Sequence, residues 1–333
     1  MRWFVTGATG FIGTTLVERL VGRGDEVRAM VRDVGRAAEL REMGAALVRG
    51  DIARPDSLSD AVDAVPDVDV VVHLAGLVKA LTREEFFSVN VEGTRSLARV
   101  AARSGRVKFV LVSSLAAAGP SAPGRPRTET DRPAPVSIYG QSKLGAEEAL
   151  RAFAPTLDAS IIRPPIVYGP RDKEFLPSLF RLARTGVIAK SGMGQKHYSL
   201  IHVDDLVAMI LDVADRGARI DEAGSSGVYF CADGVDYTWE ALARGALGAL
   251  GRRGTVVPVP EVITWLAAGV SSAAARLTGR PAILSLDKMM EIREPAWTCS
   301  PDKAKRELGW APRVSFVEGM RDSVRWFRER GLV

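Results

Sequence analysis

The stretch VTGATGFIG, residues 5–13, follows a short apolar run and opens a helical pattern. Its glycines are three residues apart. Glycine permits a tight turn and a close approach to a pyrophosphate, while the N-terminus of the following helix attracts the anion. A glycine-rich turn that binds nothing is the alternative, but the position after the first strand favours a dinucleotide-binding loop. The predicted contacts of this loop are Gly7, Thr9, Gly10, Phe11, Ile12 and Gly13.

Short β-branched runs alternate with helical patterns over the first half of the chain. Such alternation predicts an α/β fold with a doubly wound parallel sheet of the Rossmann type. The expected strands are 2–7, 26–32, 45–51, 68–76, 108–114 and 159–165, and expected helices include 13–24 and 92–105.

The pattern loosens after about residue 170. Residues 171–195 indicate a helix followed by a glycine-rich segment, 199–215 a strand running into a helix, and 227–233 a strand returning to the main sheet. We therefore predict a nucleotide-binding domain over 1–170, with returning segments at about 198–233. A smaller, mostly helical substrate-binding lobe is expected over 171–197 and 234–333. The Pro-rich insert 119–135 is long enough to have a function.

The composition is that of a globular protein without a nucleic-acid partner. The net charge of +5 comes from arginines spread along 333 residues, not from a basic stripe. Two cysteines are too few for a disulfide framework or a zinc site, so we expect a cytoplasmic protein without a metal. Residues 262–277 are the most apolar segment, but they are too short and too interrupted to span a bilayer. We expect a buried or substrate-covering helix there, with peripheral membrane contact as an alternative.

Residues after the second and third strands bear on the choice of cofactor. Arg32 precedes Asp33, and a basic residue at this place accommodates the 2′-phosphate of NADP, whereas an acid binds the ribose hydroxyl of NAD. Arginine binds phosphate in a bidentate manner, which favours NADP(H), with NAD(H) possible. Asp51 is placed to meet the adenine. Its alternative role is to cap a helix.

The stretch SIYGQSK, residues 137–143, places Tyr139 and Lys143 one helical turn apart. With the glycine loop, Asp51, HLAG at 73–76 and the paired serines at 113–114, it resembles the extended short-chain dehydrogenase/reductase family. Three later stretches also match the family: IIRPPIVYGPRD (161–172), IHVDDL (201–206) and KAKRELGWAP (303–312). The likeness therefore covers nearly the whole chain.

The resemblance implies a catalytic set of Ser114, Tyr139 and Lys143. Tyr139 would be the general acid/base, and the Lys143 ammonium would lower its pKa and bind the nicotinamide ribose. Ser114, five residues before Gly119 and 25 before Tyr139, would hold the substrate oxygen. Capping of the strand end is the alternative for Ser114, and Ser113 is expected to be structural.

The resemblance also implies roles for further positions. The expected cofactor contacts are Ile52, Ala75, Gly76, Pro164 and Ile166, in addition to Tyr139 and Lys143. Asn90 is expected to tie neighbouring strands together. Arg163 precedes a segment facing the nicotinamide. His73 and His202 lie in strand-like runs and are expected to be buried, satisfied histidines.

Departures from the pattern indicate the branch of the family. Dehydratases carry an Asp-Glu pair after the active hydroxyl, whereas residues 115–119 read LAAAG. Epimerases of nucleotide sugars carry an arginine before IHV, where this chain has Tyr198, with Lys196 as the nearest cation. Arg171, Arg181 or Arg184 could replace that arginine from the other lobe.

Positive similarities point to the dihydroflavonol reductase and 3β-hydroxysteroid dehydrogenase branch. Residues 5–33 resemble the former and SSLAAAGP (113–120) the latter. Residues 262–277 and 281–290 could wall an apolar pocket, although core packing would explain them equally well. We therefore predict an NADP(H)-dependent oxidoreductase that interconverts a secondary alcohol and a ketone on an apolar small molecule. A nucleotide-sugar epimerase using NAD and a non-catalytic cofactor-binding regulator are the alternatives, and a homodimer is possible.

Overall fold

A seven-stranded parallel sheet forms the centre of the molecule in the computed structural model, which describes residues 1–58, 65–104, 107–282 and 284–333. The strand order is β11-β6-β5-β4-β1-β2-β3, and every neighbouring pair in it is parallel. The order reverses beside β1, as in doubly wound dinucleotide-binding folds. The predicted Rossmann-type fold is confirmed.

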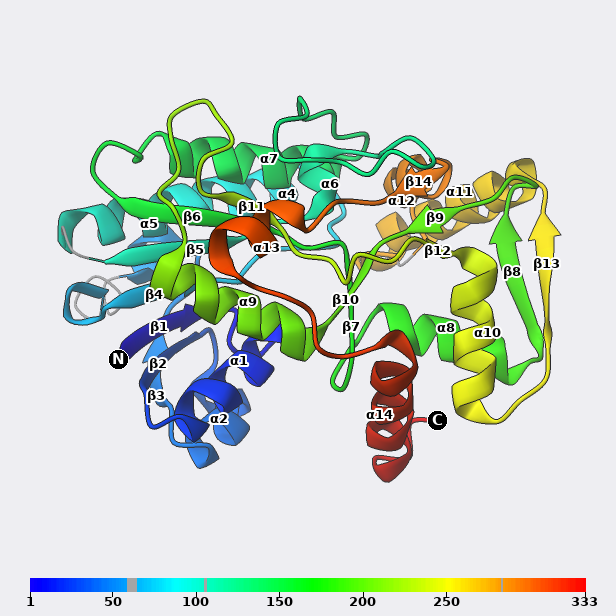
Figure 1. Cartoon of the computed structure of the whole chain (residues 1–333), viewed down its shortest axis with the longest axis horizontal. Helices are drawn as coiled ribbons and strands as arrows, with labels where there is room; N and C mark the ends of the chain where they lie inside the picture. The colour runs from blue at the N-terminus through cyan, green and yellow to red at the C-terminus, as the bar shows by residue number, and fades with distance from the viewer. Residues whose placement is uncertain (59–64, 105–106, 283) are drawn as a thin grey trace.

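The strands of the sheet and the helices around it alternate along the chain (Figure 1). The strands are β1 (Arg2–Thr6), β2 (Glu26–Val31), β3 (Ala46–Arg49), β4 (Val70–His73), β5 (Lys108–Val112), β6 (Asp158–Arg163) and β11 (Val228–Phe230). The helices are α1 (Phe11–Gly22), α2 (Ala38–Glu42), α4 (Arg83–Phe87), α5 (Gly93–Ser104), α6 (Leu115–Ala118), α7 (Ile138–Arg151), α9 (Val203–Arg216) and α13 (Asp302–Leu308).

Alternation along β1 shows why both faces of the sheet are covered. Trp3 and Val5 pack with α1, α9 and α13, whereas Phe4 packs with α5 and α7. Successive strand residues point to opposite faces, so a strand buried on both sides reads as a continuous apolar run. This explains why the strands of the first half could be recognised from the sequence.

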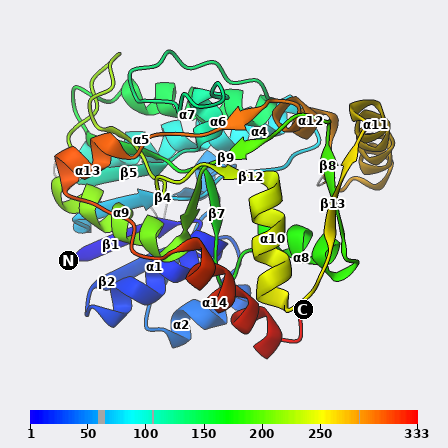
Figure 2. The same ribbon diagram turned by 45° about the vertical axis from the view of Figure 1, so that its right-hand side comes forward.

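The second lobe lies beside one end of the sheet, with its own apolar core (Figure 2). Its elements are α8 (Phe175–Arg184), β8 (Val187–Ser191), α10 (Trp239–Leu250), β13 (Thr255–Val259), α11 (Glu261–Thr278), α12 (Leu286–Ile292) and α14 (Phe316–Glu329). Two small sheets join the lobes, β7 (Ile166–Tyr168) with β10 (Leu200–His202), and β9 (His197–Tyr198) between β12 (Tyr237–Thr238) and β14 (Ala296–Trp297). Leu179, Leu242 and Val324 bring α8, α10 and α14 together.

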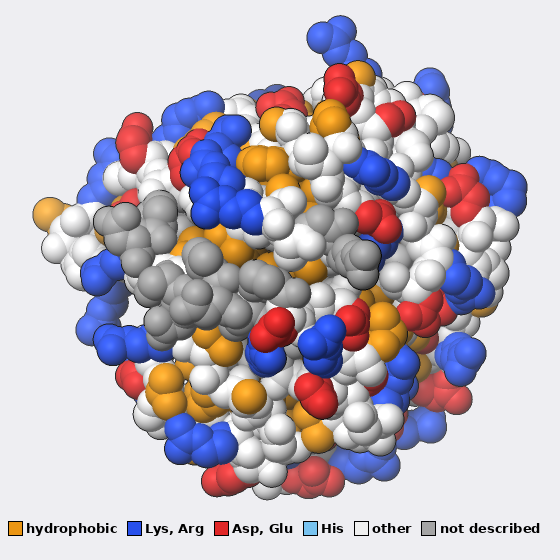
Figure 3. All heavy atoms as spheres, turned by 90° about the vertical axis from the view of Figure 1, so that its left-hand side faces the viewer, with side chains coloured by type: hydrophobic (Ala, Val, Ile, Leu, Met, Phe, Trp, Pro, Cys, Tyr) orange, Lys and Arg blue, Asp and Glu red, His pale blue; other side chains and the backbone are white. Residues whose placement is uncertain are grey.

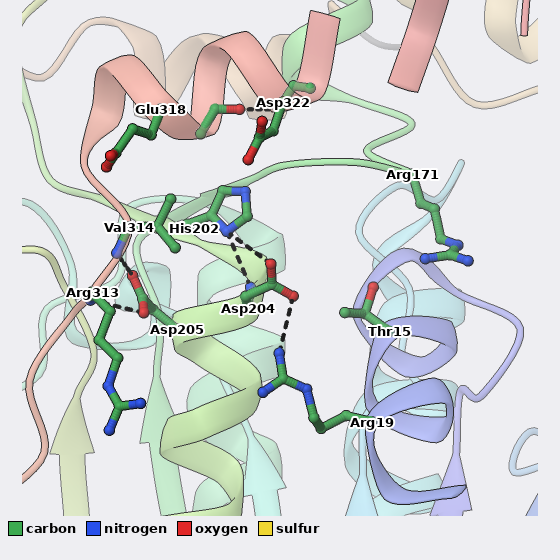
Figure 4. A network of polar contacts seen from close by, with 12 residues as sticks. Thr15, Arg19, Arg171, His202, Asp204, Asp205, Arg313, Val314, Glu318 and Asp322 are labelled. Atoms are coloured by element: carbon green, nitrogen blue, oxygen red, sulfur yellow. Dashed lines mark hydrogen bonds and ion pairs between the residues drawn. The ribbon is translucent and has the colours of Figure 1, made fainter. Parts of the chain in front are cut away.

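Two motifs far apart in the sequence meet at the start of α9 (Figure 4). The Asp205 carboxylate accepts hydrogen bonds from the backbone nitrogens of Arg313 and Val314, at 2.9 and 3.0 Å. The Trp310 indole nitrogen donates to the Asp205 carbonyl oxygen. Because these groups are paired, IHVDDL and the segment of KAKRELGWAP with the two residues that follow it act as one structural joint.

Several predicted elements are confirmed with small shifts in their ends. Residues 227–233 do return to the sheet as β11, beside β6, and 199–215 do form a strand and a helix. The glycine-rich segment after α8 contains a strand, β8, which was not predicted and pairs with β13. The insert 119–135 packs against the segment after β14, where Ser121 bonds Thr298.

The surface carries charges of both signs. Figure 3 shows basic and acidic side chains interspersed on the face at the sheet end of the molecule. No helix among the described residues is long and apolar enough to cross a membrane. Nor do the described residues include a cluster of His, Cys, Asp or Glu arranged to hold a metal ion.

Candidate active site

The predicted site residues follow the carboxyl ends of the parallel strands. Gly7–Gly13 follow β1, Arg32 follows β2, Asp51 and Ile52 follow β3, Ala75 and Gly76 follow β4, Ser114 follows β5, and Pro164 follows β6. Parallel strands end at one edge of their sheet, and ligands of such folds bind in the crevice outside this edge. The fold therefore collects residues from six separate segments.

The glycine loop makes a turn that larger residues would block. Gly7 has φ +67°, and a Cβ there would lie 2.7 Å from the backbone nitrogen of Ala75. A Cβ on Gly13 would lie 2.2 Å from the Gly7 carbonyl oxygen. Gly10 is the N-cap of α1, and neither a capping side chain nor an acidic residue occupies the first turn. The backbone N–H groups of the first turn of α1 are therefore not occupied by a side chain of that turn, which suits a pyrophosphate.

The residues expected near the adenosine differ in their hydrogen bonds and burial. Arg32 is exposed and has no hydrogen bond or ion pair within the described part of the chain. Asp33 caps its own turn by accepting a hydrogen bond from Gly35. The Asp51 carboxylate likewise accepts from the backbone nitrogen of Ala53, at 3.0 Å. Ile52 is buried in the core. Arg32 is thus an unpaired cation after β2 among the described residues.

Helix α7 carries Tyr139 in its first turn and Lys143 in its second. Ser137 caps the helix, and its hydroxyl donates to Glu291 at 2.6 Å. The Asp287 carboxylate accepts from the backbone nitrogens of Ile138 and Tyr139, at 2.6 and 3.4 Å. Helix α12 of the second lobe therefore fixes the N-terminal end of α7, and the carboxylates complement the helix dipole.

Burial raises the pKa of Tyr139 to about 12, partly opposed by a hydrogen bond from Ser114 and reinforced by the charge of Glu291. The expectation that Lys143 lowers this pKa is not met in the structure. The physical reason is that removing a phenolate from water costs more than the neighbouring groups return. At neutral pH the phenol is protonated and can donate its proton.

Lys143 is buried, and its ammonium donates to the Val112 carbonyl oxygen at 2.9 Å. Burial lowers its pKa to about 8, while Glu147, one turn further along α7, opposes the change. Glu147 itself is buried, accepts a hydrogen bond from the Ser113 hydroxyl and pairs with Arg163. Ser113 thus has a structural contact, as expected.

The Ser114 hydroxyl makes two contacts, one of which is the capping role considered for it. Its hydroxyl accepts a hydrogen bond from the Ala116 backbone nitrogen at 3.1 Å, which caps α6. It also hydrogen-bonds the Tyr139 phenol. Gly119 ends this turn with φ +88°, where a Cβ would collide with the Ala134 carbonyl oxygen at 2.1 Å. The glycine lets the insert return close to α6.

Asn90 differs from its predicted role. It lies in a π-helical turn, Ser88–Glu92, and bonds the backbone of Leu77 and the hydroxyl of Ser142. It therefore ties the loop after β4 to α7, not one strand to another, because it lies in a helical turn and its partners are in that loop and in α7. A Cβ on Gly76 would lie 2.9 Å from Asn90 Oδ1 and 3.9 Å from Lys143 Nζ. Gly76 thus lies beside the lysine.

The two histidines are both buried but differ in their contacts. His73 bonds Thr6 and Thr94, and burial lowers its pKa to about 3. This confirms a satisfied, neutral histidine. His202 accepts from Asp204 at the start of α9, whereas its Nε2 has no partner among the described residues (Figure 4). The expectation of a satisfied histidine is therefore wrong for His202, because the Tyr168 and Gly319 segments crowd that edge of the ring.

Ser114 and Tyr139 open into a cavity of about 510 Å³, here called the Tyr139 cavity. Its apolar lining includes Phe86, Leu115, Ala116, Ile166, Phe175, Leu179, Tyr198, Trp239, Leu284, Ile292 and Trp297. Lysines Lys79 and Lys288 also line it, but each is paired, with Glu174 at 2.7 Å and Glu291 at 2.5 Å. The cavity therefore offers aromatic and aliphatic surface beside the hydroxyls of Ser114 and Tyr139.

A second cavity, of about 740 Å³, lies beside Thr9 and Phe11 of the glycine loop. Arg171, Arg181 and Arg184, the three arginines considered as a diphosphate clamp, all line this second cavity. None of the three is among the described residues that line the Tyr139 cavity. They are therefore not placed to grip a diphosphate beside Tyr139.

The apolar segments 262–277 and 281–290 differ in whether they line the Tyr139 cavity. Ala282, Leu284 and Ser285 do line the Tyr139 cavity. The first segment forms most of α11, and no described residue of α11 lines the cavity. Only Ala268 and Ala275 of α11 are buried. The expectation of a buried or substrate-covering helix is wrong, because five large apolar side chains of α11 are exposed: Val262, Ile263, Leu266, Val270 and Leu277.

Two groups of contacts were missed from the sequence. Glu147 continues the spacing of Tyr139 and Lys143 by four more residues, so helical periodicity could have revealed it. Asp287 and Glu291 lie about 150 residues after α7 and carry no local signal. Only the packing of the second lobe brings them to the site.

Comparison with known proteins defines the class. The profile of the NAD dependent epimerase/dehydratase family matches residues 3–227, and the chain belongs to this family. With its fold and homologues, it is an NAD(P)-binding enzyme of the extended short-chain dehydrogenase/reductase type, an oxidoreductase of that family.

Individual relatives align over almost the full length. The chain is 33% identical to a ceramide reductase of Caulobacter vibrioides, over 98% of this chain and 94% of that one. It is 32% identical to the 4-hydroxy-2-methyl-3-oxo-4-farnesyl-3,4-dihydroquinoline-1-oxide ketoreductase of Stigmatella aurantiaca, over 98% and 96%. Among solved structures it is similar to MoeE5 in complex with UDP-glucuronic acid and NAD, with a TM-score of 0.75, 25% identity, and 99% and 100% of the two chains covered.

Proposed function

We propose that this enzyme interconverts a secondary alcohol and a ketone on an apolar, lipid-like molecule, using NADP(H). The observation that carries the proposal is the lining of the Tyr139 cavity, which is mainly apolar and in which both lysines are already paired. Binding sites for apolar ligands combine such surfaces with a few polar groups that fix orientation. The names of two relatives, a ceramide reductase and a farnesyl-quinoline ketoreductase, agree with this substrate class.

The proposed mechanism uses Tyr139 and Ser114 at the substrate oxygen. When bound, the nicotinamide cofactor supplies the hydride to the carbonyl carbon, or accepts it in the reverse direction. Ser114 holds the oxygen by a hydrogen bond, and the protonated Tyr139 phenol donates its proton as the oxygen becomes an alcohol. Lys143 is held beside Gly76 by Val112, on the side where the ribose of the cofactor would lie.

The NADP(H) preference rests on Arg32. Its exposed guanidinium follows β2, where the 2′-phosphate of NADP would come, while Asp33 is occupied with its own turn. Asp33, the acid that would bind the ribose hydroxyl of NAD, thus already accepts a hydrogen bond from Gly35. NADP(H) is therefore favoured, and NAD(H) is the weaker cofactor in this proposal.

A nucleotide-sugar substrate is disfavoured by the position of the cations. Tyr198 lies in the Tyr139 cavity where epimerases carry an arginine, and Arg171, Arg181 and Arg184 line the other cavity. A diphosphate in the Tyr139 cavity would lack a free arginine among the described residues to bind it.

A substrate panel tests the proposal directly. The purified enzyme is mixed with NADPH, and absorbance is followed with ketosteroids, flavanonols, β-keto acids and long-chain ketones, with UDP-glucose epimerisation measured in parallel. We expect NADPH oxidation with at least one apolar ketone and no epimerisation. Epimerisation of UDP-glucose without turnover of any ketone would overturn the proposal.

A further inference from the structure

Helix α11 exposes an apolar face to solvent. Ile263, Leu266, Val270 and Leu277, here called the α11 stripe, follow helical spacing and share one face. Their exposed fractions are 53%, 67%, 72% and 89%. With Val262, α11 holds five of the fourteen exposed large apolar residues in the described chain. Such concentration on one helix is not the scattered exposure usual for a protein surface.

Two polar residues of α11, Thr264 and Ser272, face the protein and attach the helix to it. Thr264 shares a hydrogen bond with Ser191 at 2.9 Å, and Ser272 accepts one from the Leu286 backbone nitrogen at 3.0 Å. Glu261, at the first turn, lies 4.0 Å from Lys196. These contacts fix the rotation of α11 about its own axis, and the α11 stripe therefore points outward. Figures 1 and 2 show α11 at the rim of the second lobe, away from the seven-stranded sheet.

We propose that the α11 stripe docks on the surface of an anionic lipid bilayer, from which an apolar substrate enters the Tyr139 cavity. Interfacial helices combine an apolar face with flanking basic residues. Arg276 and Arg280 are exposed at the C-terminal end of α11 and have no ion pair within the described residues. They would attract an anionic surface.

The position of the cavity supports a bilayer as the occupant. The chain passes from α11 directly to Ala282, Leu284 and Ser285, which line the Tyr139 cavity. Helix α12 follows, and its Asp287 and Glu291 hold the N-terminus of α7. A lipid-like substrate would therefore travel a short way from the docking face to Tyr139. This part of the inference rests on the proposed function.

A second copy of the chain fits the α11 stripe less well. A helix of 18 residues is about 27 Å long, and a face about 10 Å wide gives an area of about 270 Å². Stable protein interfaces bury about 800 Å² on each partner. The stripe alone is too small for a dimer, whereas a membrane surface needs only shallow insertion of such a face.

Vesicle flotation of the full chain tests the proposal. The wild-type protein is floated with unilamellar vesicles of phosphatidylcholine alone and of phosphatidylcholine mixed with phosphatidylglycerol. We expect stronger binding to the anionic vesicles. The double variant Leu266→Glu/Val270→Glu is expected to lower the partition coefficient at least about tenfold, since it replaces two apolar side chains that would insert with charged ones. Val317→Glu, on the 65% exposed Val317 of α14, is the matched control and should bind as wild type does.

A second pair of variants tests the contribution of charge. Replacing Arg276 or Arg280 by Gln should weaken binding to anionic vesicles about fivefold each, the factor for one basic residue at such a surface, and leave binding to phosphatidylcholine unchanged. Binding of wild type to neither vesicle, or equal losses in the Val317→Glu control, would overturn the proposal.

Two further measurements separate this inference from the proposed function. Light scattering reports whether the Leu266→Glu/Val270→Glu variant changes oligomeric state; a change without loss of vesicle binding would assign the stripe to a protein contact. Turnover of a water-soluble ketone should be equal in wild type and the double variant, whereas turnover of a ketone presented in vesicles should fall in the variant. If no ketone is turned over but flotation behaves as expected, only the proposed function fails.

Discussion

Helices α7 and α11 break the usual rule of apolar inside and polar outside in opposite directions. Helix α7 buries Lys143 and Glu147, while α11 exposes Leu266 and Val270. In α7 each buried charge has partners, Val112 for the lysine and Arg163 for the glutamate, so its cost is offset in place. In α11 nothing in the described chain covers the exposed side chains. The comparison shows that α7 satisfies its buried charges within the molecule, whereas the apolar face of α11 stays exposed to solvent.

The largest expected effect lies on α7. Tyr139→Phe keeps the ring and removes the proton donor, so kcat should fall about 10²- to 10⁴-fold, the usual contribution of a positioned acid or base. Steady-state NADPH oxidation measures the change. Tyr168→Phe is a matched control, because the Tyr168 phenol is buried without a partner among the described residues and lies outside the Tyr139 cavity. Equal losses in both variants would contradict the assignment of Tyr139.

Stability should separate the two helices next. Leu150, on α7, is fully buried, so Leu150→Ala should cost about 2–5 kcal/mol in the free energy of unfolding. Leu266→Ala, on the exposed stripe of α11, should change it by less than about 0.5 kcal/mol. Urea denaturation of the two variants provides the measurement. A cost above 2 kcal/mol for Leu266→Ala would mean that α11 packs against the protein after all.

The buried ammonium of Lys143 predicts a dependence of stability on pH. Its pKa in the folded protein is about 8, below its ordinary 10.5, so the unfolded chain binds more protons between these values and stability rises with pH. Between pH 7.5 and 10 the gain should be about 2 kcal/mol, at 1.36 kcal/mol per pKa unit. Urea unfolding of wild type is compared with Lys143→Met at both pH values. The same pH dependence in both proteins would show that Lys143 is not its source.

The smallest expected effect concerns the cofactor. Arg32→Ala should raise the KM for NADPH about tenfold, the loss of one charge-assisted hydrogen bond, and leave the KM for NADH nearly unchanged. Initial rates with each cofactor measure the split. Arg99→Ala, at an exposed position on α5, is the control and should affect neither value. An equal change for both cofactors would refute a specific contact with the 2′-phosphate.

Much of the sheet could be predicted because its strands are buried on both faces and read as continuous apolar runs. The glycine loop could be predicted because the backbone geometry at Gly7 and Gly13 excludes other residues. Strand β8 could not be predicted. Its pairing partner β13 lies more than 60 residues later, and only some of its side chains are buried. The roles of Asp287 and Glu291 are hidden for the same reason, since they depend on a contact between lobes.

The sequence alone determined the class of fold, the dinucleotide-binding loop and the spacing of Ser114, Tyr139 and Lys143, because these depend on local geometry and on the order of strands. Tertiary structure decided three further points. Burial, and not the nearby ammonium, sets the pKa of Tyr139. Packing of the second lobe places the three arginines in a cavity away from Tyr139. The rotation of α11, fixed by Thr264 and Ser272, turns an apolar segment outward, since a helix has two faces and its sequence does not state which one meets the protein.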